Sequence, residues 1–116
     1  MRDPRDARLA QVIIHHSVRL QPGEAVLIEA FDLRDGLVLD LVEEAARAGG
    51  LPLVSLRDNA VIRQVLTSGS EAQVRLQAAV EMFQMQQVQA YVGLRASDNV
   101  SELNDVPEPR MKDYMK

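Results

Sequence analysis

The stretch Gln21-Pro-Gly-Glu-Ala-Val-Leu-Ile-Glu-Ala30 joins a turn to a short apolar run. Proline fixes φ at about −65° and glycine tolerates positive φ, so Pro22-Gly23 predicts a tight turn. The bounded run Ala25 to Ile28 predicts a buried strand directly after that turn. A second bounded apolar run, Leu51 to Leu56, follows the next helical pattern. A strand, a crossover helix and another strand predict a βαβ unit with parallel strands.

Two helices are predicted around the first strand. Apolar residues at helical spacing predict an amphipathic helix from Asp6 to Leu20, with His16 in its apolar stripe and His15 beside the stripe. After the strand, Asp32 and Asp35 are acidic N-cap candidates for a helix that ends at Gly49-Gly50.

The segment after the second strand predicts two more helices. Asp58 is expected to cap a short helix that continues through Leu66, and Ser70 with Gln73 has the spacing of a capping box. The long helix that follows carries two apolar faces instead of one, so we expect it to be covered on both sides. One face comprises Leu76, Ala79, Val80 and Phe83, and the other comprises Val74, Ala78, Met82 and Met85.

A third strand is predicted from Ala90 to Leu94, followed by a polar loop over residues 95–107 and the start of a helix from Pro109. That helix begins well and has no C-cap, so we expect it to continue in a longer protein. The fold class is therefore α/β, a three-layer Rossmann-like small parallel sheet flanked by helices. The order is helix-strand-helix-strand-helix-helix-strand-helix, in one domain over residues 1–116.

Composition excludes several classes of protein. The 116 residues are 47% hydrophobic and 26% charged, which is typical of one folded domain. A net charge of −4 without a basic run disfavours nucleic-acid binding. The chain has no cysteine, no apolar run of membrane-spanning length and no signal-peptide pattern at its start, so we expect no membrane association and a cytoplasmic location.

No catalytic constellation is evident in the sequence. The adjacent His15 and His16 point about 100° apart on a helix, so we interpret His16 as a hydrogen-bonded core or edge histidine and His15 as solvated. No Gly-x-Ser-x-Gly elbow and no Gly-x-Gly-x-x-Gly phosphate loop occurs. The acidic groups Asp32/Asp35 and Asp98/Glu102/Asp105 match no metal-binding loop, and helix caps or loop hydrogen bonds explain them more simply.

One location is favoured by position alone. Open α/β sheets bind ligands at the carboxyl ends of their strands, and polar residues follow the second and third predicted strands. The candidate cleft-facing residues are Arg57, Asp58, Arg95, Ser97, Asp98 and Asn99.

Several segments resemble the N-terminal domain of the thermophilic-type metallo-aminopeptidases, the family of aminopeptidase T and aminopeptidase S. The first segment is Leu9 to Ile28, which contains the motif Gln-Pro-Gly-Glu-x-Val-Leu-Ile. The second is Glu43 to Gly50. The third is Tyr91 to Pro107, which contains the motif Ser-Asp-Asn-x-Ser-Glu-Leu-x-Asp-Val-Pro. Their order and spacing hold across nearly the whole chain.

The resemblance implies a parent enzyme that removes N-terminal residues from peptides with two divalent metal ions of the zinc, cobalt or manganese class, and that forms a homodimer. A water bridging the metals would attack the scissile carbonyl. Family members carry the metal ligands and the catalytic Glu and Tyr in a C-terminal domain, and no residue here lines up with them. No catalytic or metal residue is therefore assigned.

Two functional hypotheses follow. The first is an N-terminal domain that is inactive alone, partners a catalytic C-terminal domain and walls a peptide-binding cavity. The alternative is a stand-alone α/β binding or interaction module without catalytic activity, which would have no leftover apolar surface.

Overall fold

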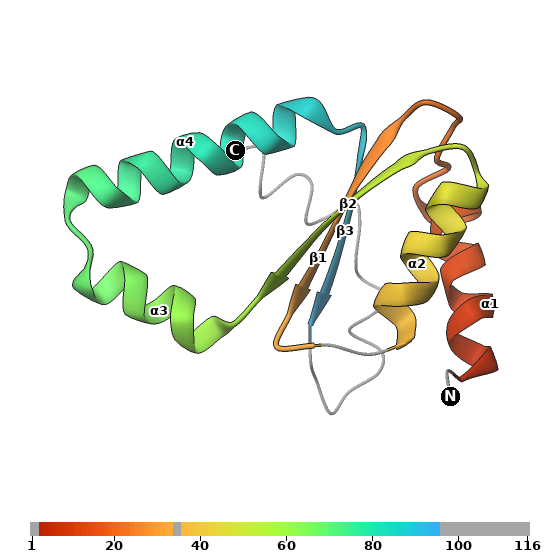
Figure 1. Cartoon of the computed structure of the whole chain (residues 1–116), viewed down its shortest axis with the longest axis horizontal. Coiled ribbons are helices and arrows are strands. Elements are labelled where there is room, and N and C mark those ends of the chain that lie inside the picture. Colours follow the sequence, from red (N-terminus) through yellow and green to blue (C-terminus); the bar gives the residue numbers. More distant parts are fainter. Residues whose placement is uncertain (1–2, 34–35, 96–116) are drawn as a thin grey trace.

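The structure, a computed structural model, describes residues 3–33 and 36–95. The predicted order of elements is confirmed through the third strand (Figure 1), and the helix predicted from Pro109 lies outside the described residues. The elements are α1 (Pro4–Val12), the π-helical turn η1 (Ile13–Ser17), β1 (Ala25–Phe31), α2 (Gly36–Arg47), β2 (Leu51–Arg57), α3 (Asn59–Ser68), α4 (Glu71–Gln87) and β3 (Ala90–Arg95).

The three strands form one parallel sheet in the order β2-β1-β3. The central strand β1 is buried from Ala25 through Ala30, as expected for a parallel strand covered on both faces. The predicted turn before it is confirmed: Gly23 has φ of 84° and its N–H donates to the carbonyl of Gly49 at 2.8 Å. This bond fixes the start of β1 against the end of α2, so that Ala25 pairs with Leu51.

The helices α1 and α2 cover one face of the sheet, together with η1 (Figure 1). Their inward residues and the alternate residues of the strands form the main core, in which Ile14, Ile28 and Leu41 are fully buried. This packing of amphipathic helices on a parallel sheet confirms the α/β prediction.

The first helix differs from the prediction because α1 passes into η1 at Ile13. A π-turn accommodates one extra residue, which rotates the apolar stripe. Ile13 and Ile14 are consequently buried, Val12 is 49% exposed, and His16 is exposed instead of lying in the core. The interpretation of His16 as a core or edge histidine was therefore wrong.

His15, predicted to be solvated, lies close to the buried carboxylate of Glu44 on α2. The Nε2 atom of His15 is 2.6 Å from Oε2 of Glu44, and Nη1 of Arg47 donates to the other carboxylate oxygen at 2.6 Å. Only 8% of the Glu44 side chain is exposed. These contacts join η1 to α2 on the outside of the core.

The opposite face of the sheet is covered sparsely. The helices α3 and α4 extend away from the sheet (Figure 1), and we call Asn59–Gln87 the arm. The arm meets this face through Met85, which packs in a small cluster with Val88, Ala25, Leu27 and Tyr91. On its outer side Leu76 and Phe83 are 66% and 64% exposed. The apolar face of α4 that carries Leu76 and Phe83 is thus exposed among the described residues, and the expectation that α4 is covered on both sides is wrong for this part of the chain.

The predicted caps of the arm are confirmed. The Asp58 carboxylate accepts a hydrogen bond from the backbone N–H of Ala60 at 2.8 Å, and the Ser70 hydroxyl accepts one from that of Gln73 at 3.2 Å. These bonds satisfy N–H groups that a helix cannot pair internally. No helix in the described ranges has the length and apolar character needed to cross a membrane.

Replacement of Leu41 by alanine should lower the free energy of unfolding by about 2–5 kcal/mol, because the side chain is fully buried and leaves a cavity. Leu39 on the same helix is 55% exposed, and its replacement by alanine should cost less than about 0.5 kcal/mol. Urea denaturation of both variants measures the difference. Equal losses would contradict the assignment of the buried face of α2.

Candidate functional site

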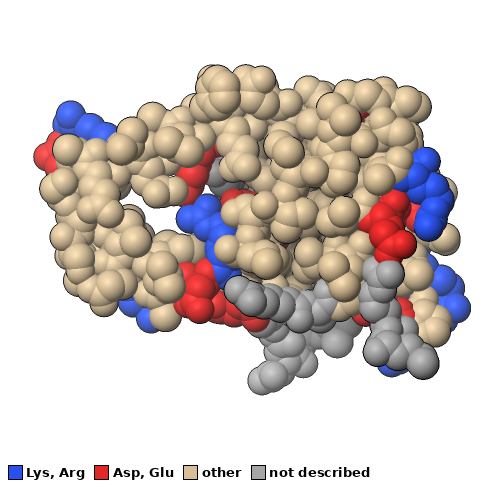
Figure 2. Space-filling view, viewed as in Figure 1, with Lys and Arg blue, Asp and Glu red and all other residues tan. Residues whose placement is uncertain are grey.

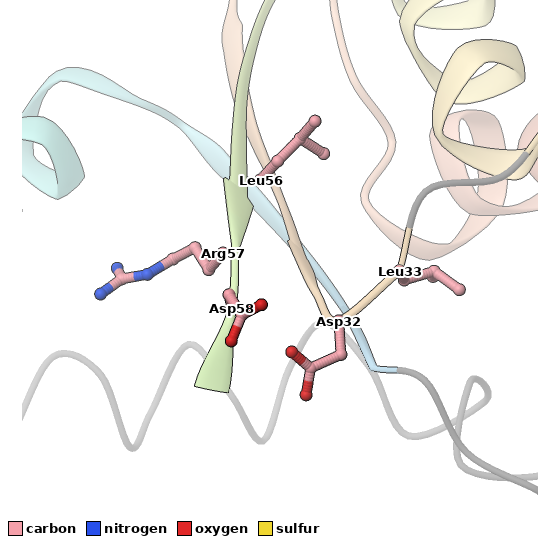
Figure 3. Close-up of a pocket in the computed structure, with 5 residues that line it drawn as sticks. All are labelled: Asp32, Leu33, Leu56, Arg57 and Asp58. Carbon is pink, nitrogen blue, oxygen red and sulfur yellow. The ribbon is translucent and has the colours of Figure 1, made fainter. Parts of the chain in front are cut away.

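The carboxyl ends of β1 and β2 lie next to each other and border a pocket of about 390 Å³ (Figure 3). It is lined by Asp32, Leu33, Leu56, Arg57 and Asp58. The carboxylates of Asp32 and Asp58 lie at the strand ends, whereas the Arg57 side chain extends away from them (Figure 3). The edge of the sheet favoured by the sequence therefore does contain a pocket.

Both carboxylates at this pocket hold the beginning of α3. Asp58 caps the helix, and Asp32 accepts hydrogen bonds from the backbone N–H and the side-chain amide of Asn59 at 2.9 and 2.8 Å. Asp32 has φ of 57° and donates its own N–H to the carbonyl of Arg57, which turns its side chain toward α3. Asp32, predicted as an N-cap candidate for the second helix, therefore contacts a different helix, and Asp35 lies outside the described residues.

A buried carboxylate lies on the sparsely covered face of the sheet. Glu29, in the middle of β1, is 1% exposed. The Tyr91 hydroxyl on β3 donates to its Oε1 atom at 2.7 Å, and Nη1 of Arg57 on β2 donates to Oε2 at 3.2 Å. A buried carboxylate is stable only when it is paired and hydrogen-bonded, and each neighbouring strand supplies one of these contacts.

Arg57 also connects this carboxylate to the arm. Its Nη2 atom is 3.0 Å from Oε2 of Glu81 on α4. Burial of the guanidinium opposes its charge, but the hydrogen bonds and charges of Glu81 and Glu29 together raise the pKa of Arg57. While both carboxylates are ionised, the stability that comes from this raised pKa is fully present below the ordinary guanidinium range and is lost as the pH rises through the raised value.

The ring of Phe31, the last residue of β1, contacts two cations. The guanidinium carbon of Arg95 is 4.9 Å from the ring centroid and that of Arg57 is 5.9 Å from it. Cations at such distances are attracted to the ring face. The ring thus holds two arginines from opposite edge strands at the same end of the sheet.

Gly93 on β3 makes room for this arrangement. A Cβ atom at this position would lie 2.9 Å from the Tyr91 hydroxyl oxygen, which is held by Glu29. Glycine is therefore the residue that allows the tyrosine to lie along the sheet toward Glu29.

The structure describes three of the six residues predicted to face a cleft. Arg57 and Arg95 meet at Phe31, and Asp58 lines the pocket while it caps α3. Ser97, Asp98 and Asn99 lie outside the described residues, and the cleft-facing role of the whole set stays a prediction.

No motif in the sequence marks Glu29, Tyr91, Glu81 or Phe31 as site residues. One signal was present, because Glu29 directly follows the predicted strand Ala25 to Ile28 and a charge in a buried strand requires a partner. The partners themselves come from strands and a helix far along the chain, and no local pattern identifies them.

The described residues do not fit a metal ion. Among residues 3–33 and 36–95, no three His, Asp or Glu side chains come together in a way that could hold one. The most buried carboxylate, Glu29, has both oxygens occupied by Tyr91 and Arg57, and the cation neutralises the charge that a metal would need.

Comparison with known proteins decides the family. A profile described as thermophilic metalloprotease (M29) matches residues 3–116. The chain belongs to the M29 family of thermophilic metalloproteases. A search of curated proteins finds no match.

Among solved structures, wild-type AmpT from Thermus thermophilus is similar to this M29 chain, with a TM-score of 0.56 and 21% sequence identity. The similarity covers 95% of this chain and 30% of the AmpT chain, so this M29 chain spans less than a third of that relative. At this identity the similarity shows the shared fold.

Replacement of Arg57 by alanine should lower the free energy of unfolding by about 3–5 kcal/mol, because it leaves Glu29 buried without a cation. The exposed arginine of the Arg75–Glu71 pair is the matched control, and its replacement by alanine should cost less than about 1 kcal/mol. Urea denaturation measures both losses.

A second substitution tests the cause of that loss. Adding Glu29→Gln to Arg57→Ala removes the unpaired charge and should recover part of the lost stability. If the double variant were as unstable as the sum of the two single variants, Glu29 and Arg57 would not be coupled.

Proposed function

We propose that this chain forms the N-terminal, non-catalytic domain of a two-metal aminopeptidase that releases N-terminal residues from peptides. The observation that supports this most directly is the M29 profile match over residues 3–116. The match to AmpT covers only 30% of that chain, which is consistent with further parts in a longer protein. In this proposal the chain contributes the sheet and its carboxyl edge.

The metals belong to the remaining part of the protein in this proposal. We take them to be divalent ions of the zinc, cobalt or manganese class, as the resemblance to the metallo-aminopeptidases implies, and the match to a metalloprotease profile supports the presence of a metal. The described residues hold no group of ligands for them, and the carboxylates near the pocket are occupied in capping α3 or in pairing with Arg57. In this proposal the contribution of this domain is positional and not chemical.

The proposed position is the wall of the peptide-binding cavity. Arg57, Asp58 and Arg95 lie where parallel sheets usually place ligands, and Ser97, Asp98 and Asn99 follow the same strand as Arg95. Phe31 restricts the Arg95 guanidinium group, which lowers the entropy cost of contacting a peptide with that side chain. A cytoplasmic location and a homodimeric parent enzyme complete the proposal.

Assays on an aminoacyl-nitroanilide test the proposed division of roles. The 116-residue chain should release no nitroaniline with or without added Zn²⁺, Co²⁺ or Mn²⁺. The polypeptide encoded by the whole reading frame should be active with one of these ions, and a chelator should abolish the activity.

Isothermal titration of the 116-residue chain with each ion is the control, and it should show no stoichiometric binding. Chelator-sensitive activity of the 116-residue chain would refute the non-catalytic role. Absence of activity from the longer polypeptide under all three ions would refute the aminopeptidase assignment.

A further inference from the structure

A groove of about 640 Å³ separates the arm from β2, and it is visible as the hollow on the left of the molecule in Figure 2. Its walls are mainly aliphatic side chains from α3 and α4. They include Val61, Ile62, Val65, Leu66, Val74 and Ala78. Val61 and Leu66 are 60% and 59% exposed, so the groove presents a largely apolar lining to solvent.

The charged groups that line the groove already have partners. Arg57 pairs with Glu81 at 3.0 Å, and the side-chain amide of Gln77 donates to Glu81 at 3.0 Å. Asp58 caps α3. A small polar ligand needs convergent polar groups to orient it. Since these groups are engaged within the chain, the groove is suited to an apolar segment of protein.

The rest of the arm has the same character. From Leu76 to Gln87 the only charged residue is Glu81, and Leu76, Val80 and Phe83 are 66%, 57% and 64% exposed. Large contiguous apolar surfaces on a folded protein mark interaction sites.

The strand that borders the groove is also incompletely covered. β2 reads Leu-Pro-Leu-Val-Ser-Leu-Arg, a nearly continuous apolar run of the kind found in parallel strands covered on both faces. In the described structure Leu56, which lines the groove, is 50% exposed, and Leu53 and Val54, which lie outside its lining, are 41% and 43% exposed. Both the strand and the arm therefore lack the covering layer that their sequences predict.

We propose that a later part of the same polypeptide packs into this groove, between the arm and β2. This inference depends on the proposed function, in which the chain continues into the metal-binding part of the enzyme. The AmpT match leaves most of that chain outside it, which supplies enough polypeptide for the role. The occupant presents aliphatic or aromatic side chains and no unpaired charge, because Arg57, Glu81 and Asp58 are already engaged and offer it no counter-charge.

A second copy of the chain fits the groove less well. Dimers are most often twofold symmetric, and a twofold axis through this surface would place groove against groove. Two concave surfaces leave the hollow unfilled, whereas a convex segment from elsewhere in the polypeptide fills it. The second copy is thus an outcome that the experiment must be able to detect.

Single cysteines on α4 test the inference, because the 116-residue chain contains no natural cysteine. Ala78→Cys places a thiol in the groove, and Ala72→Cys places one on the same helix outside it. Both positions are exposed in the described structure. Each variant is made in the 116-residue chain and in a cysteine-free version of the longer polypeptide, and its rate of labelling by a maleimide is measured.

In the longer polypeptide Ala78→Cys should react at least about tenfold more slowly than in the shorter chain, because a covered thiol reacts only when the cover opens. The rate for Ala72→Cys should be unchanged. Equal rates for Ala78→Cys in the two polypeptides would overturn the inference. Protection that appears in the shorter chain alone as its concentration rises would also overturn it, in favour of a second copy.

Nitroanilide hydrolysis in the same preparations separates this inference from the proposed function. Chelator-sensitive activity of the Ala78→Cys variant with an unprotected thiol would overturn the groove contact and leave the aminopeptidase assignment standing. Protection of that thiol in an inactive polypeptide would support the contact and count against the assignment.

Discussion

The burial of the Glu29 carboxylate is the constraint on which much of this structure depends. Removing a carboxylate from water is costly unless a cation and hydrogen bonds replace the water, and here Arg57 and Tyr91 do so from the two neighbouring strands. One side chain of β1 therefore requires a particular register in both β2 and β3. Gly93 opposite Glu29 leaves the space that the tyrosine needs.

Features that depend on neighbouring residues could be predicted from the sequence. The Pro22-Gly23 turn, the three strands and the caps at Asp58 and Ser70 follow from the conformational preferences of a few adjacent residues. The directions in which His15 and His16 face on their helix could not be predicted in the same way. It depends on a π-turn, which the periodicity of an ordinary α-helix does not contain.

The candidate site also combines residues that the sequence could predict with residues that only the whole fold brings together. The rule that ligands bind at the carboxyl edge of a parallel sheet selected Arg57 and Arg95, and the structure places both beside Phe31. The same rule gave no reason to choose Phe31 or Glu29, whose roles depend on which strands become neighbours. Strand order is a property of the whole fold. In the order β2-β1-β3, the central strand β1 lies next to both strands that carry the arginines, so Phe31 of β1 can contact both side chains.

Arg57 links the two open regions of the molecule, because it lines both the pocket at the strand ends and the groove beside the arm. Its guanidinium group forms ion pairs with two carboxylates, Glu29 in the sheet and Glu81 in the arm. The arm contacts the sheet through the small apolar cluster around Met85 and through the ion pair with Glu81. Because one guanidinium group makes both ion pairs, the pairing of Arg57 with Glu29 in the sheet depends on where the arm places Glu81.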